Sequence, residues 1–164
     1  MTSLTTGAER LLAVEHWFLS TVMDRRRVRE EWEERSLALL PCGPLFAAVR
    51  IPSLLVQAAA WSDQQDAVDR YLAEVLMGGP VICNRHADQY YALVPAGTVG
   101  RWNVPGVMCL DKGQALGVPR PGLGGADGAR VYWSVPMDSA GELCSPAAVA
   151  QVVTVGRYRS VNHG

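Results

Sequence analysis

The stretch Val81–Pro95, "VICNRHADQYYALVP", decides the fold class of this chain. Two apolar runs, Val81–Asn84 and Gln89–Val94, flank a short polar segment, and this pattern predicts a β-hairpin. Cys83 falls within the first strand, whereas His86 falls in the connection, which we expect to face solvent. Further short strand patterns follow at Val107–Leu110, Ala115–Val118 and Val131–Val135, so the second half of the chain indicates a sheet built mainly of antiparallel neighbours.

Helical patterns surround these strands. Apolar residues recur at helical spacing from Ala8 to about Arg35, with a break near Met23–Arg25. One strand is expected at Leu45–Ile51, and further helices at Pro52–Trp61, at Asp63–Met77 with Ser62 or Asp63 as cap, and at Pro146–Gly156 with Ser145 as cap.

The sequence therefore predicts an α+β fold, with a largely antiparallel or mixed sheet, helices packed on one face and a long N-terminal helix. We expect an N-terminal helical segment over residues 1–35, a single α+β domain over 36–156 and a flexible tail over 157–164.

Composition limits the classes of function. The 164 residues carry a net charge of −1, which does not favour a strong phosphate-binding surface. Fourteen of the 15 basic residues are arginine, a bias typical of GC-rich genomes such as those of actinobacteria. We expect no membrane span, because no apolar run reaches about 20 residues. With no secretory signal recognised, we expect a cytoplasmic protein whose four cysteines are reduced and mostly buried.

Cys83 and His86 form a C-x2-H pair, the weak candidate for a metal site. Zinc requires three or four ligands, and Asp88, Cys109 or Cys144 would have to be recruited by the fold. The same pair is the candidate nucleophile and base of a small-molecule enzyme. We favour a polar hairpin loop over both readings, and expect no cofactor.

The arginine-rich run "DRRRVREEWEER", residues 24–35, favours a solvated helix. Arginine and glutamate stand four residues apart in four pairs: Arg26–Glu30, Arg27–Glu31, Arg29–Glu33 and Glu31–Arg35. A nucleic-acid-binding module is the alternative, with Trp102 stacking on bases. That alternative needs the fold to gather six arginines on one face, namely Arg25, Arg26, Arg27, Arg101, Arg120 and Arg130.

Two segments, "QYYALVPAG" from Gln89 and "VPGVMCLDKGQALGVPRP" from Val104, resemble the second half of the bifunctional DNA primase/polymerase (prim-pol) domain of the archaeo-eukaryotic primase superfamily. The positions that coincide with the strand–turn–strand pattern of that family are Gly106, Val107, Gly113 and Pro119. The resemblance implies a primase-like fold.

The metal-binding residues of that family have no counterparts at the matching positions. The acidic D-x-D pair falls on Val49 and Ile51, the histidine on Gln89 and the later aspartate on Met108. Apolar side chains do not bind the divalent metals that polarise nucleotide phosphates. The resemblance thus implies a fold that has lost polymerase activity.

From these observations we expect a non-catalytic binding domain that acts through a protein partner or as a homo-oligomer. The charged N-terminal helix and the Trp102 loop are the surfaces expected to bind. A nucleic-acid-binding module and a small-molecule enzyme using Cys83 and His86 remain the alternatives.

Overall fold

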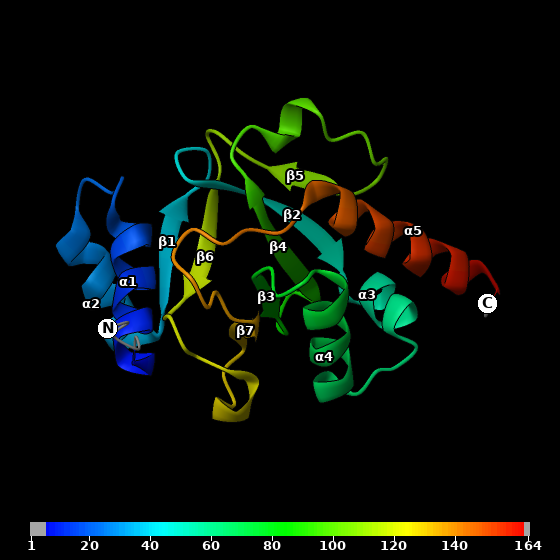
Figure 1. Ribbon diagram of the computed structural model, residues 1–164, viewed down its shortest axis with the longest axis horizontal. Coiled ribbons are helices and arrows are strands. Elements are labelled where there is room, and N and C mark those ends of the chain that lie inside the picture. The colour runs from blue at the N-terminus through cyan, green and yellow to red at the C-terminus, as the bar shows by residue number, and fades with distance from the viewer. Residues whose placement is uncertain (1–5, 163–164) are drawn as a thin grey trace, which may run out of the picture.

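The computed structural model describes residues 6–162, which form five α-helices and seven strands (Figure 1). In chain order the elements are α1 (Gly7–Leu19), α2 (Arg25–Arg35), β1 (Leu37–Pro41), β2 (Phe46–Pro52), α3 (Ser53–Ala60), α4 (Gln65–Val75), β3 (Val81–Asn84), β4 (Gln89–Pro95), β5 (Met108–Leu110), β6 (Ala115–Pro119), β7 (Val131–Val135) and α5 (Pro146–Asn162). Two short 3₁₀ turns, η1 (Thr98–Gly100) and η2 (Gly125–Asp127), complete them. The predicted α+β class with antiparallel sheets is confirmed.

The predicted hairpin forms the middle of the main sheet. Strands β3 and β4 pair antiparallel with Asn84 opposite Gln89, so four residues make the connection. Asp88 takes a positive φ of 54°, a conformation that aspartate tolerates better than most residues. The complete sheet has the order β5-β2-β4-β3-β7, and all its neighbours are antiparallel.

A second, two-stranded sheet joins β1 to β6, and β1 is a strand that the sequence analysis missed. Strand β1 is followed by β2, and β5 is followed by β6. Because β1 pairs with β6 and β2 pairs with β5, the four strands form one antiparallel ribbon that bends between the two sheets. At the bend, the Cys42 amide donates to the Gln114 carbonyl at 2.8 Å. The turn predicted around Gly113 is present, with φ +89°, but the strands on its two sides enter different sheets.

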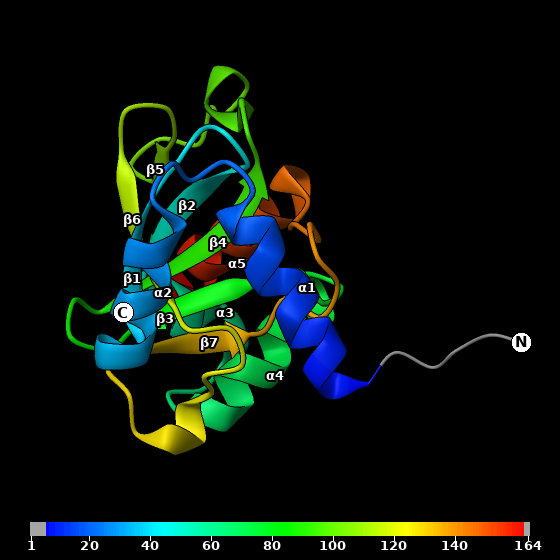
Figure 2. The same ribbon diagram turned by 90° about the vertical axis from the view of Figure 1, so that its left-hand side faces the viewer.

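Helices cover both faces of the main sheet, not one face as predicted (Figures 1 and 2). Alternate residues of β2 point in opposite directions. Phe46 and Ala48 join the core beneath α1 and α2, whereas Val49 and Ile51 join the core beneath α3, α4 and α5. Strand β2 is apolar on both faces, and this requires a covering layer on each side.

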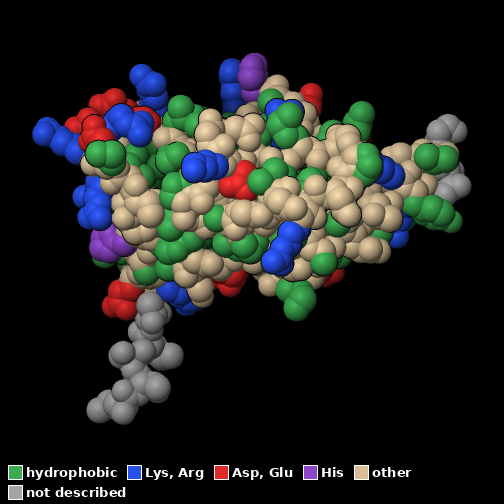
Figure 3. Space-filling view, turned by 90° about the horizontal axis from the view of Figure 1, so that it is seen from above, with side chains coloured by type: hydrophobic (Ala, Val, Ile, Leu, Met, Phe, Trp, Pro, Cys, Tyr) green, Lys and Arg blue, Asp and Glu red, His purple; other side chains and the backbone are tan. Residues whose placement is uncertain are grey.

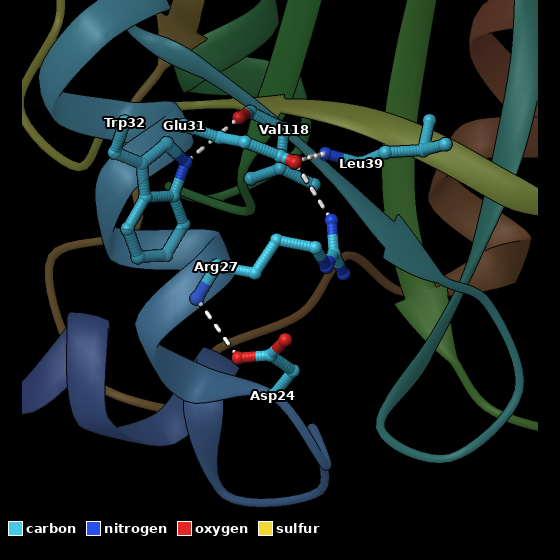
Figure 4. A network of polar contacts seen from close by, with 6 residues as sticks. All are labelled: Asp24, Arg27, Glu31, Trp32, Leu39 and Val118. Atoms are coloured by element: carbon cyan, nitrogen blue, oxygen red, sulfur yellow. Dashed lines mark hydrogen bonds and ion pairs between the residues drawn. The ribbon is translucent and has the colours of Figure 1, made fainter.

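The N-terminal helical segment is two helices, and the chain between them runs up to the break expected near Met23–Arg25. Helix α1 ends at Leu19, and α2 begins at Arg25 after Asp24, whose carboxylate accepts the Arg27 amide at 3.0 Å. The Trp32 indole N–H donates to the Val118 carbonyl of β6 at 3.0 Å and so fixes α2 against the small sheet (Figure 4). Both helices contribute to the same core as the main sheet.

Helix α5 is longer than predicted. It continues through Gly156 to Asn162, so residues 157–162 are helical where a flexible tail was expected, and 163–164 lie outside the described residues. A Cβ at Gly156 would overlap the carbonyl oxygen of Leu55 in α3. This glycine therefore permits close packing of two helices and does not end one.

Three further predictions concern the start of α4, the cysteines and membrane-spanning helices. Helix α4 begins at Gln65, two residues later than expected, and neither Ser62 nor Asp63 caps it with its side chain. All four cysteines are free and buried, as predicted. Within residues 6–162, no helix has the length and apolar character needed to cross a bilayer.

Candidate functional site

The hairpin does not bring Cys83 and His86 together. The Cys83 side chain is 2% exposed in the core beneath α4, whereas His86 is exposed in the turn. Burial raises the pKa of the Cys83 thiol, although contacts with Tyr132 and Tyr90 oppose the shift. A buried thiol of raised pKa is a poor nucleophile and a poor metal ligand. Among residues 6–162, no three or more His, Cys, Asp or Glu side chains are placed to hold a metal ion.

A polar cluster that sequence reasoning missed lies next to Cys83. The Asp69 carboxylate of α4 accepts from the Ser134 hydroxyl at 2.5 Å and from the Gln65 amide at 2.9 Å. The Tyr132 hydroxyl lies 3.4 Å from the same carboxylate, and Gln65 also donates to the Tyr90 hydroxyl at 2.9 Å. Burial raises the pKa of Asp69, while the hydrogen bonds from Ser134, Gln65 and Tyr132 lower it. The cluster ties α4 to the sheet.

The arginines of α2 are committed to local contacts. The Arg25 guanidinium donates to the Leu19 carbonyl at 3.1 Å. Ion pairs join Arg26 to Glu30 at 3.0 Å and, as Figure 4 shows, Arg27 to Glu31 at 2.7 Å, both as expected. The expected Arg29–Glu33 and Glu31–Arg35 pairs are absent from the described residues, and Arg29 instead bridges to Glu15 of α1 at 3.2 Å.

The other candidate arginines lie elsewhere. Arg101 follows η1, Arg120 lies at a groove beside α1 and α2, and Arg130 precedes β7. Figure 1 places η1, α2 and β7 in different regions of the molecule, and in Figure 3 the basic groups are scattered or stand beside acidic ones. On the face that Figure 3 shows, the basic side chains do not gather into one patch of the kind that nucleic-acid binding uses.

The Trp102 side chain is hydrogen-bonded and packed within the domain. Its indole N–H donates to the Val107 carbonyl at 2.8 Å, and its ring packs against the core beneath α3–α5. With Arg101 and the start of α5, it lines a hollow of about 640 Å³. The Trp102 loop is therefore folded back on the domain, and the Trp102 ring is not free to stack on a base.

A cleft of about 470 Å³ lies where residues of β2, β4 and β5 meet the segment that precedes β5. Six residues line it: Arg50, Pro52, Gln89, Gly106, Val107 and Met108. Arg50 stands opposite Met108 on β5, and Pro52 stands opposite Gln89 on β4. The sequence analysis singled out Gln89 and Met108 through the prim-pol resemblance, and the fold brings these two positions to the same cleft.

Val49 and Ile51 do not belong to this cleft. Both face the opposite core beneath α3, because residues of one strand alternate between its two faces. Two acids of β2 sharing the cleft with Gln89 and Met108 would have to stand at positions 50 and 52, the β2 residues that line it. Those positions carry an arginine and a proline. The four positions at which the resemblance places metal-binding residues therefore do not converge on one site. They are Val49, Ile51, Gln89 and Met108.

A surface on the far side of the molecule combines exposed apolar residues with an arginine. Leu54 and Ala58 of α3 and Trp61, the residue that caps its C-terminus, are spaced four and three residues apart, and Leu54 is 78% and Trp61 57% exposed. The Arg159 guanidinium of α5 lies 5.0 Å from the Trp61 ring centroid, and the two helices frame a hollow of about 470 Å³. We call these four residues the α3–α5 surface. Sequence reasoning missed it because the arginine and the apolar ridge are a hundred residues apart.

Comparison of the chain with protein families, curated proteins and solved structures finds no significant match.

Proposed function

We propose that this chain is a non-catalytic binding domain that acts through a protein partner. The observation that carries the proposal is the α3–α5 surface. A large aromatic ring, a leucine and an arginine in one exposed group are the residue types that dominate protein interfaces. Patches of this kind on monomers most often mark interaction sites.

The partner we propose is an amphipathic helix that lies along α3. An apolar ridge spaced over two turns matches the i, i+3, i+4 anchors by which one helix packs in a groove. Arg159 borders the ridge and already stacks on Trp61. An acidic residue of the partner would pair with this guanidinium, since arginine has five donors and contacts within the domain use only part of them.

The absence of catalysis is the second part of the proposal. Its support is the chemistry of the sheet cleft, whose lining residues include no carboxylate and no histidine. The resemblance to prim-pol domains is compatible with this, because β2 lines the cleft with Arg50 and Pro52 where metal-binding acids would be needed. Nucleic acid is a weaker candidate partner, given the net charge of −1 and the scattered arginines.

The test is capture of partners by the tagged, full chain from its native host, with nuclease present. Three chains are compared: wild type, Leu54→Arg and Leu12→Arg. Both leucines are exposed, at 78% and 51%, so neither substitution disturbs the core. We expect a protein whose recovery falls about tenfold or more with Leu54→Arg and is unchanged with Leu12→Arg.

The captured protein is then purified and titrated against the three chains, because variant-dependent recovery must reflect direct binding. Equal affinity for wild type and Leu54→Arg would refute the α3–α5 surface. Recovery only of material that nuclease removes would replace a protein partner with nucleic acid.

A further inference from the structure

The sheet cleft contains two polar side chains that the domain itself does not satisfy. Within residues 6–162, the Arg50 guanidinium makes no ion pair and no side-chain hydrogen bond. The Gln89 Oε1 atom is enclosed and has no hydrogen-bond partner. An unpaired enclosed oxygen is costly, and native structures retain few of them without a reason.

These two groups are close enough to contact one small molecule. Arg50 pairs with Tyr91, two residues beyond Gln89 on the same face of β4, so the two lie on a diagonal of the β2–β4 ladder. Diagonal neighbours are about 7 Å apart at Cα. Gln89 lines the cleft, and the broad terminal torsion of glutamine lets its amide turn towards a bound ligand, whereas in the free protein Oε1 stays enclosed.

A contact from helix α5 holds one wall of the cleft in place. Arg157 of α5 donates to the Pro105 carbonyl, which fixes the segment before Gly106. Gly106 has a positive φ of 77°, and a Cβ there would lie 3.0 Å from the Arg157 guanidinium. Met108, Val107 and Pro52 supply apolar contact around the two polar groups. This mixture of apolar walls and a few convergent polar groups is typical of small-molecule sites.

We propose that the cleft binds a small organic anion that carries an N–H donor near its anionic group, without a metal ion. Arg50 contacts the anionic group, because a guanidinium matches carboxylate and phosphate geometry. Gln89 Oε1 accepts the N–H of the ligand and thereby gains the partner that it lacks in the free protein. No carboxylate lines the cleft, so no residue there repels the anion or holds a divalent metal.

The experiment is a titration of the ¹⁵N-labelled full chain, followed by NMR, with and without EDTA. The probes are N-acetylglycine, its phosphonate counterpart acetamidomethylphosphonate, and acetoxyacetate, which replaces the N–H by oxygen. Each is added to about 50 mM, which covers the affinity expected of ligands of this size. We expect saturable shifts of the Arg50 Nε–H and of the backbone amides of Gln89 and Met108.

Variants assign the contacts. Arg50→Gln should weaken binding about tenfold or more, Arg50→Lys should weaken it less, and Arg101→Gln should leave it unchanged. N-acetylglycine should bind at least about fivefold better than acetoxyacetate, and Gln89→Leu should abolish that preference. Unchanged resonances far from the cleft verify that each variant is folded.

The relative affinity of the carboxylate and phosphonate probes identifies the anionic group, and either order supports the site. The proposal is overturned by the absence of saturable shifts with all probes, by equal affinity in Arg50→Gln and wild type, or by binding that EDTA removes.

Discussion

At the residue scale, polar side chains of this protein pair across the fold, stay unpaired or pair within a helix. The sequence does not distinguish the first two. Asp69 looks like one of several acids near a helix start, yet it faces the sheet and accepts three donors. Gln89 is a strand residue with an enclosed, unpaired oxygen. Of the four charge pairs that spacing predicts on α2, Arg26–Glu30 and Arg27–Glu31 form, whereas Arg29 pairs with Glu15 of α1. Spacing of four residues makes a helix pair possible, and tertiary packing decides whether the side chain uses it.

Asp69 predicts a pH dependence of stability. Its folded pKa is raised above the ordinary value of 3.8 by burial, so the folded state binds a proton more tightly than the unfolded chain. The contribution of Asp69 to stability is therefore greatest at low pH and declines as pH rises from 3.8 through its folded pKa. Asp69→Asn removes this dependence. We expect the stability of the variant relative to wild type to increase with pH across this window and then to level off.

The measurement is urea unfolding of both proteins at several values from about pH 4 to about pH 8. Their difference in unfolding free energy isolates Asp69 from the other carboxylates. A difference that is independent of pH, or that declines as pH rises, would contradict the assignment of a raised pKa.

Gln89 predicts a variant that gains stability. Gln89→Leu removes the enclosed, unpaired oxygen and should raise the free energy of unfolding by about 1 kcal/mol. Gln114→Leu is the matched control, because the Gln114 Oε1 accepts the Asp111 amide at 2.9 Å. Loss of that bond should lower stability by about 1 kcal/mol. Denaturant unfolding compares the two, and a similar loss in both would show that Gln89 is satisfied.

At the scale of elements, local signals were read correctly and distant pairings were not. The β3–β4 hairpin agrees with the prediction except that β4 ends one residue later, at Pro95, because the turn and both strands are adjacent in sequence. Strand β1 was missed because it follows a helix directly, and its partner β6 lies far along the chain. Gly156 was read as the end of α5, since glycine is a common helix terminator. Only the neighbouring α3 reveals why a glycine is needed there.

Replacing Gly156 by alanine should change stability in the direction opposite to that seen in an ordinary helix. In an ordinary helix interior, glycine to alanine stabilises by about 1 kcal/mol. Here the added Cβ meets the Leu55 carbonyl oxygen, so Gly156→Ala should destabilise the protein by about 2 kcal/mol through overpacking. Thr154→Ala, on the exposed side of α5, should change stability little. Thermal unfolding measures both, and a stabilised Gly156→Ala would refute the close α3–α5 packing.

At the scale of the whole molecule, the sequence predicts the fold class but not the distribution of its surfaces. Alternating apolar strands and amphipathic helices indicate α+β, yet only the three-dimensional structure shows that helices cover both sheet faces. Of the expected binding surfaces, the charged helix α2 packs on β6 through Trp32 while its arginines stay exposed, and the Trp102 ring packs on the core. The α3–α5 surface and the sheet cleft each combine residues from distant parts of the chain, and no local pattern marks them.

The central claim is that the α3–α5 surface binds a partner protein, and it is tested most directly inside the cell. A photo-crosslinking amino acid is placed at position 54 or at position 12 of the full chain in its native host, and the adducts are identified after irradiation. We predict a single protein crosslinked from position 54 and not from position 12, with loss of the adduct when Trp61→Ala is added. Equal crosslinking from both positions, or no protein adduct from position 54, would contradict the account.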